Sequence, residues 1–191
     1  MKKIKTIARA ISIPLLVITI AWGLRTYGFR FIFISGASME PTYSSRDIVF
    51  LNQLTPRFIG YSRGDVVVAD MQGCEMLHGE YIVKRIIGLP GETVELKNDQ
   101  VYIDGELLND YIFDTSVSSL TSIISFFLPH APASDSESAP SEVSVTLGNN
   151  EYFLLGDNRS VSLDSRNIKI GPVSQDRLLG RVQFKILGIL N

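Results

Sequence analysis

The chain has 191 residues, with 18 basic and 20 acidic side chains and a formal net charge of −2. This length suits one medium-sized domain with an appendage, which can bury a core without metals or disulfides. The near balance of charge argues against a broad cationic face and therefore against a nucleic-acid partner. Cys74 is the only cysteine, so no internal disulfide can form.

A basic tip and an apolar stretch open the chain. Basic residues at positions 2, 3, 5 and 9 precede the uncharged, mostly apolar residues 10–24, a pattern that predicts a cytoplasmic N-terminus. A helix over that stretch would span only about 22 Å, short of the roughly 30 Å hydrocarbon core unless Arg9 and Arg25 reach out to the headgroups. We predict one retained transmembrane helix within residues 1–27. A cleaved secretory signal and a buried helix remain as alternatives.

Residues 28–191 are expected to form a mainly β domain. Short runs rich in β-branched and aromatic residues alternate with turn signals such as Leu89-Pro90-Gly91 and Asp104-Gly105. Thr93 to Ile103 is predicted to form a hairpin that turns at Asn98-Asp99. Because amphipathic helices do not alternate with these runs, an antiparallel sheet is favoured over a parallel α/β sheet. The predicted strands are 29–34, 48–51, 65–69, 81–87, 93–96, 100–103, 152–155 and 181–187.

One stretch departs from this pattern. Ser, Ala and Pro dominate residues 114–146, and acidic residues are scattered through its second half. Such a composition is typical of a mobile surface segment rather than of a packed core. We therefore predict an insertion at 114–146 within the domain 28–191.

Three polar features stand out against the apolar runs. Residues 156–166 are densely polar and charged, Ser38 follows the first predicted strand, and Lys84 lies inside the apolar run 81–87. Together they supply a nucleophile, a base and a supporting network. A serine hydroxyl needs a neighbouring base to become nucleophilic, and a lysine whose charge is disfavoured by burial can serve.

Each feature also has a simpler interpretation. Lys84 could point into solvent from an edge strand, and Ser38 could cap a turn. A Ser-His-Asp triad is disfavoured, because the two histidines lie beside a glycine, at 78, and in the predicted insertion, at 130. No metal or organic cofactor is expected, since metal-ligand residue types do not cluster and no Gly-rich phosphate loop is present.

The joint pattern resembles the signature boxes of type I signal peptidases. The boxes are Ser38-Met39-x-Pro41-Thr42, Lys84-Arg85-x-x-Gly88-x-Pro90-Gly91 and Gly156-Asp157-Asn158-Arg159-x-x-Ser162-x-Asp164-Ser165-Arg166, in the family's order and spacing. Gly64-Asp65-Val66-Val67 and Val101-Tyr102-Ile103-Asp104-Gly105 also match, so the resemblance covers most of residues 30–185 outside the insertion.

This resemblance implies a membrane-anchored endopeptidase that removes signal peptides from exported preproteins on the outer side of the plasma membrane. It assigns Ser38 as the nucleophile and Lys84 as the general base, with Ser162 bonding and orienting the lysine amine. It also implies supporting pairs between Asp157 and Arg85 and between Asp164 and Arg166. The expected partners are signal-peptide-bearing preproteins and the lipid bilayer.

The resemblance further implies cleavage after small residues in the pattern Ala-x-Ala, because shallow apolar pockets reject larger side chains. The residues expected to contact an extended substrate are Ile34, Ser35, Gly36, Met39 and Val83. The backbone N–H of Ser38 is the expected oxyanion donor, since Gly36 offers no hydroxyl where some relatives carry serine. Tyr43, where relatives commonly carry leucine, is another departure and could alter the substrate pocket.

Three rival functions share parts of the pattern. An inactive, membrane-tethered relative would have lost a catalytic side chain, and none is lost here. A soluble, self-cleaving Ser/Lys repressor would carry a DNA-binding domain where this chain has its basic, apolar start. A specialised peptidase that processes a conjugation or pilus subunit would share the Ser/Lys pair, and the sequence alone does not separate it from a general signal peptidase.

Overall fold

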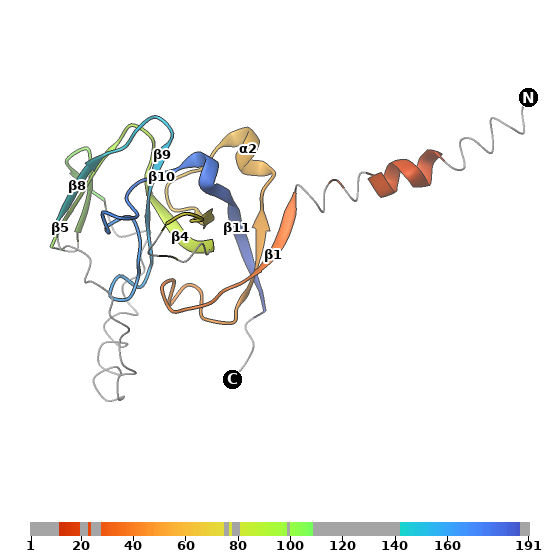
Figure 1. Ribbon diagram of the computed structural model, residues 1–191, viewed down its shortest axis with the longest axis horizontal. Helices are drawn as coiled ribbons and strands as arrows, with labels where there is room; N and C mark the ends of the chain where they lie inside the picture. The colour runs from red at the N-terminus through yellow and green to blue at the C-terminus, as the bar shows by residue number, and fades with distance from the viewer. Residues whose placement is uncertain are drawn as a thin grey trace, which may run out of the picture.

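The computed structural model describes residues 12–19, 23, 28–74, 77, 81–98, 100–108 and 142–187 (Figure 1). Of the predicted anchor, residues 12–19 form a helix. None of the helices in these described ranges is long and apolar enough to cross a bilayer. The transmembrane helix therefore stays a prediction. His78, His130 and most of the predicted insertion lie outside the described residues.

The larger sheet of the described chain has seven strands in the order β1-β2-β11-β3-β4-β9-β10, and each pair is antiparallel. Strand β4 lies between β3 and β9, with Lys84 opposite Val67 on β3. The last strand, β11, runs between β2 and β3. The strands are β1 (Phe29–Phe33), β2 (Ile48–Asn52), β3 (Val66–Asp70), β4 (Tyr81–Gly88), β9 (Glu151–Leu155), β10 (Val173–Ser174) and β11 (Leu178–Leu187).

A second, four-stranded antiparallel sheet has the order β7-β6-β5-β8. Its strands are β5 (Thr93–Lys97), β6 (Gln100–Ile103), β7 (Glu106–Leu107) and β8 (Val143–Thr146). The hairpin of β5 and β6 pairs Lys97 with Gln100, and Asn98 at the turn has a φ of 50°. Figure 1 places this sheet on the opposite side of the domain from β1 and β11.

The prediction of a mainly β, antiparallel domain is confirmed. All eight predicted strands form, with ends shifted by no more than a few residues. Strands β7, β8 and β10 and the short helix α2 (Thr55–Ile59) were not predicted. Strand β8 is also a correction to the insertion at 114–146, because Val143–Thr146 pair with β5 in the second sheet.

Buried side chains from both sheets form the core that joins them. Ile87 and Phe153 from the large sheet pack with Val94 and Leu147 from the region of the small sheet. Gly88, at the end of β4, lies at this junction, where an added Cβ would meet side-chain atoms of Val94, Leu147 and Phe153. The sheets can approach this closely only because the residue at 88 has no side chain.

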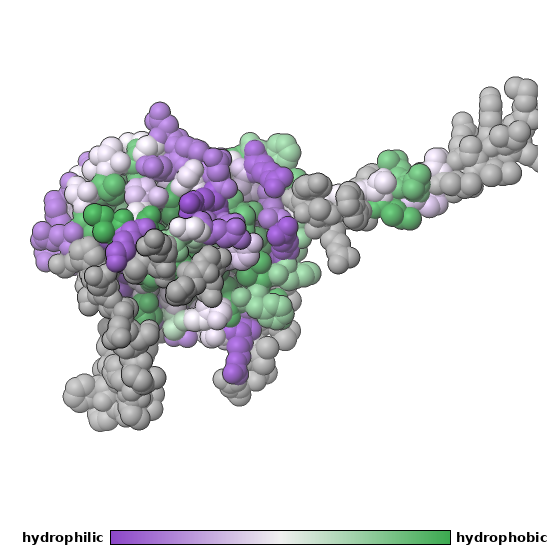
Figure 2. All heavy atoms as spheres, viewed as in Figure 1, coloured by the Kyte–Doolittle hydropathy of each residue, from purple (hydrophilic) through white to green (hydrophobic). Residues whose placement is uncertain are grey.

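Aromatic side chains cover the outer face of the β1 edge. Phe29, Phe31 and Phe33 alternate along β1 and therefore share one face, and Phe31 and Phe33 are 64% and 69% exposed. The Phe50 ring on β2 stacks on Phe29 and on Phe184 of β11, with centroids 5.2 and 4.9 Å apart. We call these five residues the aromatic face. Figure 2 shows hydrophobic residues gathered where Figure 1 places β1 and β11.

Candidate active site

The loop between β1 and β2 presents Ser38. The loop is closed at its base by backbone hydrogen bonds between Ile34 and Asp47 and between Arg46 and Ile34, each 2.8 Å long. Ile34 and Met39 are buried in an apolar cluster beneath the loop, whereas Ser38 between them keeps part of its surface exposed. The loop is thus fixed from below and offers the serine to solvent, as expected for a residue just past a strand end.

Lys84 reaches Ser38 from the middle of the large sheet. Its Nζ lies 2.7 Å from Ser38 Oγ, and the residue is only 4% exposed. Neighbouring strands on both sides of β4 exclude the alternative of a solvent-facing edge lysine. Burial lowers the pKa of Lys84 to about 8, although Asp164 and Asp157 oppose this shift. At pH 7 a minor fraction of the amine, on the order of one tenth, is therefore uncharged.

Asp157 ties the Ser38 loop to β4. Arg85 binds this carboxylate through two hydrogen bonds, from Nε to Oδ1 at 2.8 Å and from Nη2 to Oδ2 at 2.6 Å. Thr42, four residues after Ser38, donates its hydroxyl to Asp157 Oδ2 at 2.6 Å. The predicted Asp157–Arg85 pair is present, and the threonine links it to the loop of the candidate nucleophile.

Asp164 and Arg166 form a second, deeply buried pair. Arg166 Nε donates to Asp164 Oδ1 at 2.8 Å, and Nη2 donates to the carbonyl oxygens of Arg159 and Ser162 at 2.8 and 3.1 Å. Asp164 Oδ2 accepts the N–H of Gly156 at 3.0 Å. These bonds close the 156–166 loop on itself, so the predicted pair holds the shape of the loop beside Lys84.

Ser162 does not make the hydrogen bond predicted for it. Its Oγ is buried and has no hydrogen-bond partner among the described residues, Lys84 Nζ included. The side chain instead packs against Gly156, where an added Cβ would overlap Ser162 Oγ and lie 2.5 Å from the carbonyl oxygen of Ser38. In this structure, Ser162 therefore contributes to the site by packing closely beneath Ser38 and not by a hydrogen bond to Lys84.

The predicted substrate contacts fall into two groups. Ser35 and Gly36 are exposed, and Val83 is half-buried. Ile34 and Met39 are 5% and 1% exposed, so they lie under the surface that a substrate would touch rather than on it. Tyr43 packs against the same cluster, and burial raises the pKa of its phenol.

Sequence reasoning missed two contacts that fix the site. Thr42 stood in the first box without a role, because nothing in its spacing shows that Asp157 lies opposite. Asn158 donates its backbone N–H to the carbonyl oxygen of Ser38 at 3.0 Å, and backbone contacts of this kind leave no side-chain signal. Within the described ranges, His, Cys, Asp and Glu do not cluster as three or more potential metal ligands.

Comparison with known proteins gives the family. The model of the family described as signal peptidase, peptidase S26, matches residues 7–187. The chain belongs to this signal peptidase family. Signal peptidase I S of Bacillus subtilis (strain 168) is 34% identical over 191 residues, covering 96% of this chain and 89% of the relative. Signal peptidase I of Bacillus amyloliquefaciens is 30% identical over 184 residues, covering 93% and 84%.

A solved structure of a signal peptidase I from Enterococcus faecalis V583 is also similar. It shares 28% identity, covers 64% of this chain and 97% of its own, and superposes with a TM-score of 0.46. Family membership makes this protein a hydrolase of the signal peptidase I class, which are serine endopeptidases. The resemblance to type I signal peptidases expected from the three boxes is thereby confirmed.

Proposed function

We propose that this signal peptidase removes N-terminal signal peptides from exported preproteins, with Ser38 as the nucleophile and Lys84 as the general base. One observation carries the proposal. The buried Lys84 amine, with a pKa lowered to about 8, lies 2.7 Å from Ser38 Oγ. This is hydrogen-bond distance, as required of a base that takes the proton of a nucleophile.

In the proposed reaction, neutral Lys84 takes the hydroxyl proton while Ser38 Oγ bonds to the scissile carbonyl carbon. The backbone N–H of Ser38 donates to the developing oxyanion, and the lysine returns its proton to the leaving amine. The same amine then takes a proton from water, the hydroxide bonds to the acyl carbon, the bond from that carbon to Ser38 Oγ breaks, and the lysine returns the proton to Oγ. The Asp157–Arg85 and Asp164–Arg166 pairs hold the two loops around the reacting groups.

We assign cleavage after Ala-x-Ala to a shallow surface around the loop. The exposed backbone at Ser35 and Gly36 is free of bulky side chains, and the apolar cluster beneath it is filled by Ile34 and Met39. A substrate adding there as an extended strand would lie over this filled cluster, which favours small residues beside the scissile bond.

Membrane attachment is the second part of the proposal. The basic tip and apolar stretch within residues 1–27 favour an anchor with a cytoplasmic N-terminus. The aromatic face begins at Phe29, directly after this segment, and exposed aromatic rings are typical of surfaces that meet a bilayer. The catalytic domain then lies on the outer side of the plasma membrane, against the lipid.

The test is cleavage of a precursor peptide bearing Ala-x-Ala by the full chain in detergent or lipid, with fragment masses recorded. We expect a cut after the second alanine, and a loss of at least about 10³-fold in rate for Ser38→Ala and for Lys84→Ala. Ser45→Ala on the same loop and Lys97→Ala on the second sheet are matched controls, since both residues are exposed.

Wild-type rates in Lys84→Ala would exclude the lysine as base. The Tm of each variant shows whether a loss of rate comes from the missing catalytic group or from unfolding of the domain. A panel of secretory precursors then distinguishes a general signal peptidase from a specialised one, because turnover of a single pilin-like precursor alone would support the specialised enzyme.

A further inference from the structure

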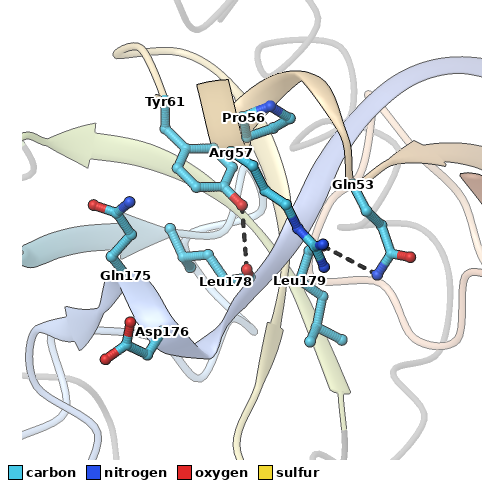
Figure 3. Close-up of a pocket in the computed structure, with 8 residues that line it drawn as sticks. All are labelled: Gln53, Pro56, Arg57, Tyr61, Gln175, Asp176, Leu178 and Leu179. Atoms are coloured by element: carbon cyan, nitrogen blue, oxygen red, sulfur yellow. Dashed lines mark hydrogen bonds between the residues drawn. The ribbon is translucent and has the colours of Figure 1, made fainter. Parts of the chain in front are cut away.

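A cavity away from Ser38 lies between α2 and the turn that enters β11. Its volume is about 290 Å³, and Figure 3 shows its lining side chains converging from separate parts of the chain. The turn is the short 3-10 helix η4 (Gln175–Arg177). The lining residues are Gln53, Pro56, Arg57, Tyr61, Gln175, Asp176, Leu178 and Leu179.

Backbone hydrogen bonds fix two of its polar walls. Gln53 Nε2 donates to the carbonyl oxygen of Leu179 at 3.2 Å, and the Tyr61 hydroxyl donates to that of Leu178 at 3.2 Å (Figure 3). Burial raises the pKa of Tyr61 to about 12, so this hydroxyl stays protonated. These hydrogen bonds hold both side chains in place on the wall, and the Tyr61 hydroxyl has its one donor hydrogen already bound to the protein.

Two side chains of opposite charge also line the cavity and can contact a ligand. Arg57 comes from α2 and Asp176 from η4, and both are exposed. Neither forms a salt bridge with another described residue. An anion alone would be attracted by the arginine and repelled by the aspartate. The lining therefore suits a small ligand that carries both a negative and a positive group.

The position of the cavity indicates where such a ligand comes from. Gln53 donates its backbone N–H to the carbonyl oxygen of Gly28 at 2.8 Å, and Gly28 directly follows the predicted anchor. Phe58 and Ile59, next to Arg57 on α2, are 80% and 71% exposed. An arginine beside two exposed apolar side chains is typical of segments at a membrane surface, where the charge meets headgroups and the apolar groups meet acyl chains.

We propose that this cavity binds the headgroup of an aminophospholipid. Arg57 binds the phosphodiester, Asp176 accepts hydrogen bonds from the primary amine, and Phe58 with Ile59 contacts the start of the acyl chains. A cavity of about 290 Å³ is at the lower end of ligand-pocket sizes, which suits a headgroup rather than a peptide segment. This inference rests on the proposed membrane attachment and is independent of the Ser38 chemistry.

The experiment titrates the full chain in non-ionic detergent micelles with short-chain phosphatidylethanolamine, and native mass spectrometry counts the lipid adducts. Phosphatidylcholine and phosphatidylglycerol are titrated in parallel. We expect phosphatidylethanolamine to bind about tenfold more tightly than either, because only its headgroup combines a phosphodiester with an amine that donates hydrogen bonds.

Two variants test the assigned contacts. Arg57→Gln is expected to weaken binding of all three lipids about tenfold, because each carries the phosphodiester. Asp176→Asn is expected to weaken phosphatidylethanolamine binding more than phosphatidylcholine binding and so to reduce the preference, because the amine loses a charged hydrogen-bond acceptor whereas the quaternary ammonium loses only electrostatic attraction. Arg177→Gln and Glu106→Gln are matched controls, since both residues are exposed and outside the cavity.

Equal binding of phosphatidylethanolamine by the wild type and both variants would overturn the proposal. So would stronger binding of phosphatidylglycerol, which indicates general attraction to anionic surfaces. If soluble phosphoethanolamine displaced the lipid at an equal concentration, the ligand of the cavity would be a free phosphate ester rather than a membrane lipid. If both variants left lipid binding unchanged but raised the KM for precursors in a separate cleavage assay, the cavity would be a peptide site. Because binding is measured without hydrolysis, failure of the proposed peptidase reaction gives a separate result.

Discussion

The proposed dyad of Ser38 and Lys84 depends on a lysine that is buried away from water. The amine is buried with its pKa lowered to about 8, and its hydrogen-bond partner is the hydroxyl that it would deprotonate. The positive charge on a buried amine destabilises the native state. Raising the pH removes this charge, so both stability and activity are expected to increase with pH. Both responses can be measured.

Peptidase activity should rise with pH through an apparent pKa near 8. In the proposed mechanism neutral Lys84 is the active form, and it accumulates as pH rises through the native pKa of about 8. Initial rates on an Ala-x-Ala peptide across pH 6 to 10, at saturating and at low substrate, check this. A flat profile over that range would show that another group sets the rate.

Stability should follow the same titration. In the unfolded chain Lys84 titrates near 10.5, so between about pH 8 and 10.5 the unfolded state binds more protons and stability rises with pH. Below pH 8 the buried charge costs on the order of 3 kcal/mol. Lys84→Met should therefore be more stable than the wild type in denaturant unfolding at pH 7, with the gain fading above pH 10.5. A loss of stability at pH 7 would contradict this.

Thr42 is predicted to position the nucleophile loop. Its hydroxyl bond to Asp157 joins the loop of Ser38 to the ion pair beside Lys84. Thr42→Val removes the donor but keeps the shape, and we expect kcat to fall about tenfold with KM little changed. Thr42→Ser, which restores the hydroxyl, should recover most of the rate. Equal losses in the two variants would assign the effect to the missing methyl or branching instead.

At the scale of the elements, sequence reasoning placed the strands well and the contacts between loops poorly. Periodic apolar runs such as Tyr81–Gly88 carry a strong local signal. Strands β7 and β10 have two residues each, too few to show a period. Strand β8 alternates Val and Ser or Thr, but its neighbours in a Ser- and Pro-rich stretch concealed it.

The three boxes predicted which residues gather at the site, because their order and spacing carry the family resemblance. They did not predict how those residues meet. The burial of Lys84 follows from β3 and β9 on either side, which local sequence does not specify. The packing of Ser162 against Gly156 likewise depends on how a loop turns back beneath Ser38.

Gly156→Ala should disable the site through the contact of two loops. The new methyl group would overlap Ser162 Oγ and crowd the Ser38 carbonyl oxygen, and backbone there cannot move without shifting the nucleophile. We expect a fall in kcat of at least about 10²-fold, since small displacements of reacting groups have effects of that size. Gly148→Ala is the control, because its methyl group meets only the flexible end of Glu151. Full activity of Gly156→Ala would show that the loops separate readily.

At the scale of the whole molecule, the domain has an apolar outer side as well as an apolar core. The aromatic face is continuous across β1, β2 and β11 through ring stacking, although several of its rings are exposed. A group of exposed aromatic rings is typical of a surface that binds a membrane or another apolar partner. In the proposed orientation that neighbour is the bilayer from which substrates emerge.

The double variant Phe31→Ser with Phe33→Ser should weaken attachment of the catalytic domain to lipid. We expect hydrolysis of a lipid-embedded precursor to fall several-fold, because the domain no longer gains free energy by transferring two phenyl rings from water into the lipid. Cleavage of a short soluble peptide in detergent should be unchanged. Tyr81→Ser serves as the matched control, since Tyr81 is an exposed aromatic residue outside the face. An equal fall on both substrates would indicate damage to the fold.

The place of β11 in the sheet sets the order in which this enzyme can become active. The Ser38 loop connects β1 and β2, whereas Lys84 lies on β4 beside β3. Among the strands of the described residues, β11 alone pairs with both β2 and β3. A ribosome makes β11 after every other strand of the described chain. Before β11 pairs, the Ser38 loop and the strand of Lys84 therefore lie on parts of the sheet that share no strand ladder. We therefore expect the proposed dyad to be complete only after β11 has been made and has paired with β2 and β3.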